Sequence, residues 1–450
     1  MNTPKTRDKL IKLGAEKLAD ALLKLAEQNE EVDDYMEHIL STPSENVVRF
    51  KAKLAGLKRR TRFITWAESR YFAQDLETML ENLEAGIKTP EEGLELVADF
   101  FKSDRYIFEL CDDSGGYVGD VFRCNACTLF IKFANSCRNK TTVLQLLKNL
   151  YKKDDYGVRF CPIESASQYL SENDIRILIE EFEKEALKYE DDSREKCHWQ
   201  SGMQTLAEEL KDAGLFEKIT TEMYPSLPTA ICLDIAGVYL KAGDPKKALV
   251  WVHKIPHEDE YMIYEKYELL LAIYQKLGDV EKSTEVAWIL FRRNRTEKSL
   301  SQLLDVIGLD KKDKVLQDEC EIIVNQTELS LIDAHFLFTI GLLDEAAKYI
   351  LSHWQQLDGD QYGSILPLAT GFKKNKKYLA ASILYRALLE SNLRRAQSKY
   401  YHHGVRYLKK LDNLSSLITE WGDCVSHQDY FQDLSEKHKR KRSFWGRYGK

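Results

Sequence analysis

The stretch that decides the fold is a nine-residue pattern that occurs twice. Residues 236–244 read Ala-Gly-Val-Tyr-Leu-Lys-Ala-Gly-Asp, and residues 271–279 read Leu-Ala-Ile-Tyr-Gln-Lys-Leu-Gly-Asp. The second copy begins 35 positions after the first, so the tyrosine, the glycine and the aspartate recur together. A glycine can adopt the left-handed backbone that ends a helix, and the aspartate after it can accept from the first N–H groups of the next helix. Each copy therefore predicts a helix, a tight turn and a second helix.

The same frame extends in both directions along the chain. A turn is expected near Gly214 upstream and near Gly308, Gly341 and Lys376 downstream, which gives steps of 29 to 35 residues. Small residues lie five positions after several of these turns, where two helices must approach closely: Ala248, Ser283, Ala346 and Ala381. The pattern resembles the tetratricopeptide repeat (TPR), a helix–turn–helix unit of about 34 residues. The tryptophan and the terminal proline of that repeat are mostly missing, so the resemblance is to a degenerate form.

The first half of the chain is also predicted to be helical. Leucines at positions 10, 13, 18, 22 and 25 follow the spacing of a helix face that packs on a core. The charge-rich stretch 189–196 indicates a solvated connector. Further helices are expected near 45–58, 66–85, 90–101, 118–137, 142–151 and 172–188.

We therefore predict an all-α protein in three parts. A helical N-terminal region covers residues 1–190, and a TPR-like helical-repeat α-solenoid covers residues 197–436. A basic aromatic tail covers residues 437–450.

The composition excludes several classes of protein. The chain has 450 residues, a formal net charge of −7, and only 22 Gly and 9 Pro, so it is not collagen-like. Aromatic residues make up 11% of it, which argues against a wholly disordered chain. There is no apolar run of about 18 residues, so no membrane span is predicted. The nine cysteines are scattered and odd in number, which indicates reduced thiols and a cytoplasmic protein.

Three segments together resemble a bacterial domain family of unknown function. Residues 13–19 read Leu-Gly-Ala-Glu-Lys-Leu-Ala, residues 111–122 read Cys-Asp-Asp-Ser-Gly-Gly-Tyr-Val-Gly-Asp-Val-Phe, and residues 438–445 read His-Lys-Arg-Lys-Arg-Ser-Phe-Trp. Their order and spacing span nearly the whole chain. The resemblance implies an all-helical cytoplasmic protein and brings no activity with it. Some relatives are joined to SWIM-type zinc fingers, but the Cys-x-Cys…Cys-x-His pattern of that module is not found in this sequence.

The most loop-like segment of the first half is residues 112–120, which carry three aspartates and three glycines. Asp112, Asp113 and Asp120 could converge on a divalent cation, because such ions take oxygen ligands. A phosphate cradle is disfavoured, since no Gly-Lys-Ser/Thr follows and three carboxylates would repel the anion. The simpler interpretation is a tight turn in which Asp120 caps the helix that begins at Val121. A protein-binding loop is the third alternative.

The pair Cys124 and Cys127 invites a zinc or redox hypothesis. A structural zinc site presents such a pair on a tight turn, with a second pair in range. Here the pair lies within an apolar helical run, and Cys111 and Cys137 do not form a second pair of that spacing. Buried thiols on a helix are the better interpretation.

Two basic stretches stand out against the acidic total. The first contains Arg59, Arg60 and Arg62, with Phe63 and Trp66 just beyond. The second is the tail, whose candidate contact residues are Lys439, Arg440, Arg442 and Trp445. Cations with interleaved aromatic rings can neutralise phosphates and stack on bases. Alternatively, the first is a solvated helix face, and the tail docks its aromatic rings on the last helix pair.

The architecture indicates function more clearly than any single site does. Helical-repeat arrays expose long surfaces that bind segments of other proteins, so we expect a non-enzymatic protein–protein interaction scaffold with an unknown partner. The alternative is a nucleic-acid-associated protein that uses residues 51–62 and 437–450. A metal-dependent enzyme at Asp112, Asp113 and Asp120 is a weaker alternative. No cofactor, catalytic residue or metal ligand is predicted.

Overall fold

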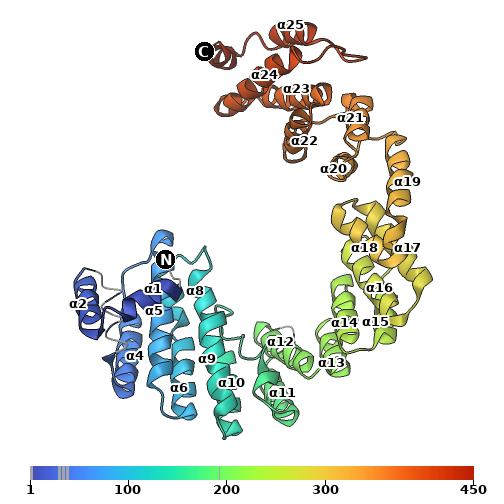
Figure 1. The fold of residues 1–450 in the computed structure, drawn as a ribbon. Helices are drawn as coiled ribbons and strands as arrows, with labels where there is room; N and C mark the ends of the chain where they lie inside the picture. The colour runs from blue at the N-terminus through green and yellow to red at the C-terminus, as the bar shows by residue number, and fades with distance from the viewer. Residues whose placement is uncertain (1–3, 29–31, 33–35, 37–39, 192, 450) are drawn as a thin grey trace. The chain divides into compact units, whose positions relative to one another are not determined.

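The structure is a computed structural model that describes the 450-residue chain except residues 1–3, 29–31, 33–35, 37–39, 192 and 450. The chain divides into two compact units, Met1–Pro256 and His257–Lys450. Within the described residues every regular element is a helix (Figure 1), and the extended pairing is limited to one isolated bridge between Ile64 and Cys111. The prediction of an all-α protein is confirmed.

The helices of the first unit follow the predicted ranges closely, apart from the ends of a few elements. Helices on both sides of residue 190 pack together, namely α11 and α12. The described helices are α1 (Pro4–Ile11), α2 (Ala15–Ala26), α4 (Pro43–Leu57), α5 (Trp66–Gly86), α6 (Pro90–Phe101), α7 (Asp104–Phe108), α8 (Tyr117–Asp120), a π-helical segment (Val121–Ala126), α9 (Cys127–Ser136), α10 (Lys140–Tyr151), α11 (Glu172–Ala186), α12 (Arg194–Glu209), α13 (Ala213–Met223), α14 (Thr229–Lys241) and α15 (Pro245–Val252).

One part of the core of the first unit is built from the apolar faces of α5, α6 and α9. Phe100 and Phe101 of α6 are fully buried, and the ring of Phe101 meets that of Phe130 edge-on at 6.3 Å. A buried ion pair adds to this core. Nε of Arg159 donates to Oδ2 of Asp104 at 2.8 Å, and its Nη2 donates to Oδ1 at 2.5 Å. Because both partners are out of water, this two-point contact holds the loop after α10 against α7.

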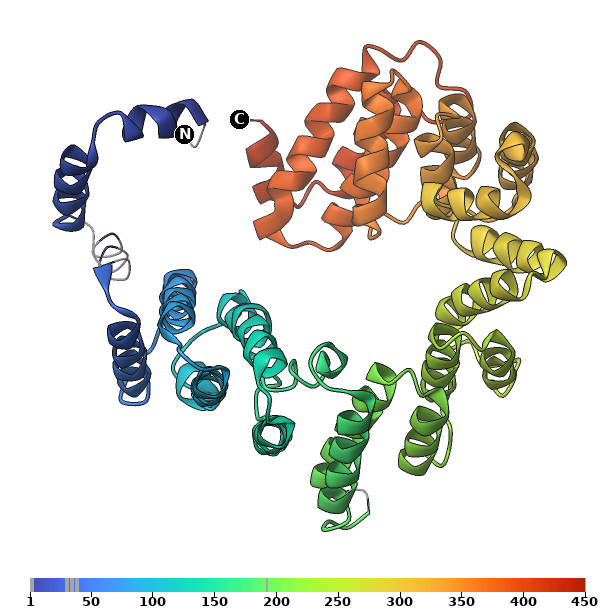
Figure 2. The ribbon, with the colours of Figure 1, turned by 60° about the horizontal axis from the view of Figure 1, so that its bottom comes forward.

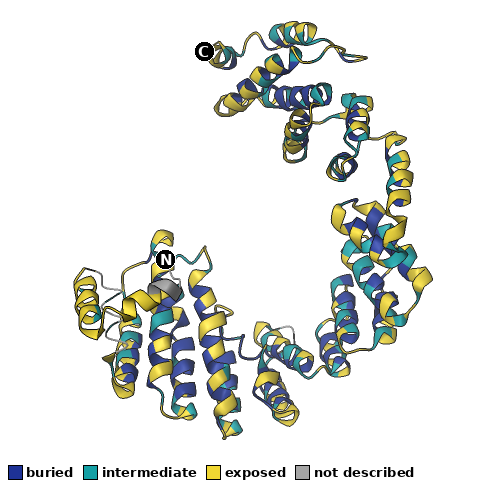
Figure 3. Cartoon of the chain, viewed as in Figure 1, coloured by how far each residue is buried: buried dark blue, intermediate teal, exposed yellow. Residues whose placement is uncertain are grey.

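The leucine face near the N-terminus differs from its prediction. Leu10, Leu13, Leu22 and Leu25 are between 44% and 53% exposed. Figure 3 shows α2 as exposed surface, and every residue of that helix is exposed or partly exposed. The prediction of a core-facing stripe is therefore wrong for this structure. Helical periodicity identifies an amphipathic helix, but it does not supply the element against which the apolar face packs.

The second unit has its helices paired in sequence order. In both views α22, α23 and α24 (orange to red) lie side by side (Figure 1; Figure 2), and α23 packs on both of its neighbours. The helices are α16 (Ile263–Leu277), α17 (Val280–Arg293), α18 (Glu297–Ile307), α19 (Lys312–Val324), α20 (Leu331–Thr339), α21 (Leu343–Ser352), α22 (Tyr362–Lys374), α23 (Tyr378–Arg394), α24 (Tyr401–Ser415), α25 (His427–Lys437) and α26 (Arg442–Tyr448).

One turn geometry recurs between consecutive helices. A residue with φ between 54° and 90° ends the first helix, and the next N–H bonds back to the carbonyl five residues earlier at 2.9 to 3.0 Å. This left-handed closure satisfies carbonyls that the helix end would leave unpaired. The turn residues are Lys211, Gly243, Gly278, Gly341 and Lys376.

Two turns differ from their predictions, the first in position and the second in geometry. The first lies at Lys211, three residues before the predicted Gly214, which is inside α13. The aspartate that starts the next helix explains the position of this turn. The side chain of Asp212 accepts from the N–H of Leu215, in the same way that Asp244 accepts from the N–H of Lys247. Gly308 has φ 107° and ψ 137°, outside the left-handed helical region, and a short 3₁₀ turn follows it.

Replacing either of two nearby glycines with alanine is expected to change the stability of the first unit in opposite directions. Gly243→Ala is expected to destabilise the first unit by about 1 kcal/mol, because φ there is 86° and a Cβ is strained in that conformation. Gly237→Ala is expected to stabilise it by about 0.5–1 kcal/mol, because Gly237 lies inside α14 and alanine is the better helix former. A Cβ at either position meets nothing within 4 Å, so packing does not confuse the comparison. Urea unfolding of the two variants gives the sign of each change in the free energy of unfolding. Changes of equal sign would contradict the left-handed turn at Gly243.

Candidate functional site

The isolated bridge brings together two segments that the sequence analysis treated as separate candidates. The N–H of Ile64 donates to the carbonyl of Leu110 at 2.8 Å, and the N–H of Asp112 donates to the carbonyl of Ile64 at 2.9 Å. Ile64 and Cys111 are both buried at this point. The end of the first basic stretch therefore lies beside the start of the aspartate–glycine loop.

Exposed aromatic rings surround this junction. Trp66 at the start of α5 is 57% exposed, Phe63 is 52% exposed and Tyr117 at the start of α8 is 40% exposed. A Cβ placed on Gly115 would lie 2.7 Å from Cε2 of Tyr117 and 3.3 Å from Nε1 of Trp66, so the two rings flank this glycine. We call this region the Trp66–Tyr117 surface; it consists of Arg59, Arg60, Arg62, Phe63, Trp66, Asp112 and Tyr117.

The three arginines of the surface all have contacts within the chain. Nε of Arg59 donates to the carbonyl of Ala55 at 3.2 Å, and the guanidinium of Arg60 lies 4.9 Å from the centre of the Phe72 ring. Arg62 forms an ion pair with Glu68, whose pKa is lowered by hydrogen bonds from Thr65 and by the charge of Arg62. The basic stretch is thus partly neutralised where it meets the loop.

The aspartates of the loop have separate local roles. Asp113 accepts from the N–H groups of Val118 at 2.9 Å and Gly119 at 2.8 Å, so it caps α8. Asp112 accepts from the N–H of Ser114 at 3.1 Å and from its hydroxyl, and these bonds lower the pKa of Asp112. Asp120 is exposed and makes no side-chain cap bond among the residues described, so the predicted capping role belongs to Asp113. Across the described part of the chain, no group of three or more His, Cys, Asp or Glu side chains is placed to hold a metal ion.

The two cysteines of the pair Cys124 and Cys127 lie in different environments. Cys124, on the π-helical turn, is exposed, and Cys127 is buried, so the prediction of two buried thiols is wrong for Cys124. The buried thiol lies next to Cys161, which is distant in sequence. A hydrogen bond from Cys161 lowers the pKa of Cys127, whereas that same contact and burial raise the pKa of Cys161.

The C-terminal tail is folded onto α24. Phe444 is fully buried, with its ring 5.8 Å from that of Tyr401, and Nε1 of Trp445 donates to the carbonyl of His438 at 2.9 Å. Lys439 pairs with Glu436 at 2.5 Å. Arg440 and Arg442 are exposed.

Two of the cavities in the described part of the second unit have no counterpart among the predictions from sequence. One, of about 410 Å³, is lined by Tyr362, Tyr400, Tyr407 and Arg395, among others. The other, of about 320 Å³, lies on α23 around Arg386. Their walls come from helices and loops up to some 80 residues apart, and the sequence has no spacing signal that joins them.

Within the described residues, the fold and these surfaces define an all-helical protein that exposes aromatic side chains. The chain belongs to a family of unknown function, DUF6880, whose sequence pattern it matches over residues 2–447. The expected membership of an unknown-function family along nearly the whole chain is thereby confirmed. Comparisons with curated proteins and with solved structures find no significant match. Among the described helices, none has the length and apolar content needed to cross a membrane.

Proposed function

We propose that this protein is a non-enzymatic scaffold that binds another protein. The observation that carries the proposal is the Trp66–Tyr117 surface, where the exposed rings of Trp66 and Tyr117 flank Gly115 close to the Ile64–Cys111 bridge. The exposed ring of Phe63 directly precedes Ile64, and the three arginines of the surface come just before it in the chain. Tryptophan, tyrosine and arginine are the residue types that contribute most to binding at protein interfaces. A gathering of exposed apolar rings on a globular unit is typical of an interaction site.

The repeated turns support the scaffold part of the proposal. Their shared left-handed closure is what a degenerate TPR-like array over residues 197–436 would require at each helix pair. In such an array each pair packs on its neighbours and presents a face to a partner. The cytoplasmic location and the bacterial origin that the sequence predicts belong to this proposal as well.

Nucleic-acid binding is less well supported by the same contacts. Phosphate binding needs cations that are free to replace counterions. Arg62 is paired with Glu68, and Asp112 adds a negative charge to the surface. In the tail, Lys437 lies 2.9 Å from Glu390, and Lys439 also has an acidic partner. Asp112 and Asp113 accept from different groups of the chain and Asp120 is exposed, so the loop gives a metal-dependent enzyme no support, and we do not propose one.

The test is capture from the native cell by a tagged full-length chain, with Trp66→Ala as the disrupting variant. Loss of a central aromatic contact is expected to reduce recovery of the partner at least tenfold, which corresponds to about 1.4 kcal/mol or more. Trp66 is more than half exposed, so the substitution should leave the fold intact, and circular dichroism checks this.

Tyr261→Ala is the matched control, because Tyr261 is 66% exposed and lies in the loop between α15 and α16, outside the Trp66–Tyr117 surface and on no helix of the array. It should leave recovery unchanged. A nuclease-treated sample runs in parallel. Equal recovery with Trp66→Ala would contradict the proposal, and so would material that disappears on nuclease treatment.

A further inference from the structure

Arg386 of α23 is a buried cation in an unusual setting. Its side chain is 8% exposed, and its Nη1 donates to the carbonyl of Val425 at 2.8 Å. The guanidinium carbon lies 4.8 Å from the centre of the Trp421 ring and 4.4 Å from that of Tyr430. The two rings and the carbonyl hold the guanidinium in place from the loop after α24 and from α25.

The other side of this guanidinium is unsatisfied. We call its Nε and Nη2 atoms the fork edge, and within the described residues neither atom has a hydrogen-bond partner. Burial lowers the pKa of Arg386, and Tyr430 and Cys424 oppose this shift. Leaving two of the three nitrogens of a buried guanidinium without hydrogen bonds is unfavourable, and aromatic rings compensate only in part. The fork edge therefore requires a partner.

The same chain shows which partner fits such an edge. Arg159 uses its own Nε and Nη2 to bind the two carboxylate oxygens of Asp104, also out of water. The planar fork of arginine matches a carboxylate at two points, which gives the contact both strength and direction.

A cavity of about 320 Å³ adjoins Arg386, and its lining restricts the kind of ligand that can bind there. Leu357, Ile383 and Val425 give it an apolar wall. Two of its carboxylates are already paired, since Asp358 lies 3.3 Å from Arg394 and Glu390 lies 2.9 Å from Lys437. A third, Asp433, also lines the cavity. These acids disfavour a multiply charged anion, and a single carboxylate attached to an apolar group fits best.

We propose that this cavity binds a carboxylate on the fork edge of Arg386. The carboxylate belongs either to a free small acid or to the C-terminus of a peptide. Because Nε and Nη2 are buried in the structure, entry requires part of their surroundings to move aside. We infer that the irregular segment 416–426 moves, since it carries Trp421, whose ring centre lies 4.8 Å from the guanidinium carbon. The site is separate from the Trp66–Tyr117 surface, so either proposal can fail alone.

The test measures thermal unfolding of the full chain in a buffer free of carboxylates. Benzoate represents a free acid, and N-acetyl-alanyl-alanine, with or without an amidated C-terminus, represents a peptide end. A ligand at 100 times its dissociation constant should raise the melting temperature of the second unit by about 5–10 °C. Arg386→Met should abolish this rise, and Arg440→Met, an exposed cation of the same unit, should retain it. The amidated peptide should have no effect.

Either of two results would overturn the proposal: no carboxylate stabilises the wild-type chain, or all of them stabilise the Arg386→Met variant equally. A second measurement covers the case in which that variant does not fold. The ¹⁵Nε–H resonance of Arg386 in the wild-type chain should shift on adding the active acid. An unchanged resonance would mean that water, rather than a carboxylate, satisfies the fork edge.

Discussion

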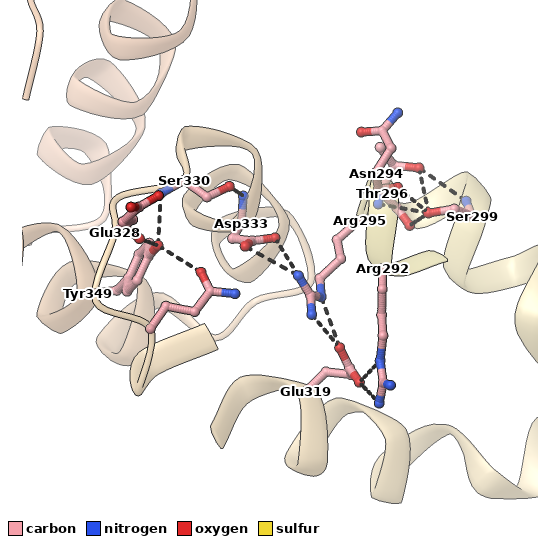
Figure 4. A network of polar contacts seen from close by, with 11 residues as sticks. Arg292, Asn294, Arg295, Thr296, Ser299, Glu319, Glu328, Ser330, Asp333 and Tyr349 are labelled. Atoms are coloured by element: carbon pink, nitrogen blue, oxygen red, sulfur yellow. Dashed lines mark hydrogen bonds and ion pairs between the residues drawn. The ribbon is translucent and has the colours of Figure 1, made fainter. Parts of the chain in front are cut away.

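Replacing Glu319 with alanine is expected to destabilise the second unit by about 3–5 kcal/mol. Glu319 of α19 is fully buried and accepts from two arginines (Figure 4). Nε of Arg292 donates to its Oε1 at 2.9 Å, and Nη2 of Arg295 donates to its Oε2 at 2.7 Å. Arg295 also reaches Asp333 of α20 at 3.1 Å, so the network joins α17, α19 and α20. Without Glu319, the buried Arg295 keeps only one acidic partner, and its desolvation is no longer offset.

Arg292→Ala is the matched control for this network. Its side chain is 51% exposed, so its ion pair with Glu319 is screened by water and its loss should cost about 1 kcal/mol or less. Urea unfolding gives the two free energies, and hydrogen exchange in α19 locates the change. If both variants lost the same small amount, the network would not hold the three helices together.

Replacing Phe444 with alanine is the second change with a large expected effect. It should lower the free energy of unfolding of the second unit by about 3–5 kcal/mol. The ring is fully buried against Tyr401, and α26 packs on α24. The hydroxyl of Tyr448 donates to Oδ2 of Asp412 at 2.9 Å, which fixes the far end of the same helix. Truncation leaves a cavity that the neighbouring helices fill only in part.

Arg447→Ala removes a charge from the exposed face of the same short helix, and its effect should stay within about 0.5 kcal/mol. Thermal unfolding of both variants separates a structural tail from a free basic arm. A free arm would be insensitive to loss of Phe444. If the tail were a free arm, loss of the Arg447 charge would instead weaken its binding to polyanions, and that binding would depend on the salt concentration.

Much of the fold could be predicted from local patterns. The Gly-Asp pairs at Gly243 and Gly278 end one helix and start the next because both effects act within a few residues. Lys211 and Lys376 adopt the left-handed conformation without being glycine; the last turn was predicted at Lys376, whereas the first was predicted at Gly214, three residues too late. There the packing of the flanking helices overrides the preference of a single residue.

The candidate sites were less predictable. Arg62 and Asp112 were recognised as separate features, but the bridge between Ile64 and Cys111 that joins them leaves no signal in the spacing of residues. The burial of Arg386 could not be predicted from the sequence, since an arginine in a helix is ordinarily exposed. Its burial depends on Trp421 and Tyr430, which follow it by more than thirty residues.

The amino-acid sequence by itself determined that this protein is helical, where most helices begin and end, and to which family it belongs. These properties depend on neighbouring residues, on capping and on periodicity. Only the tertiary structure decided that the leucine face of α2 stays exposed, that Phe444 is buried, and that an aromatic surface forms around Gly115. The physical reason is that burial and juxtaposition depend on contacts between distant segments, and no short-range pattern carries that information.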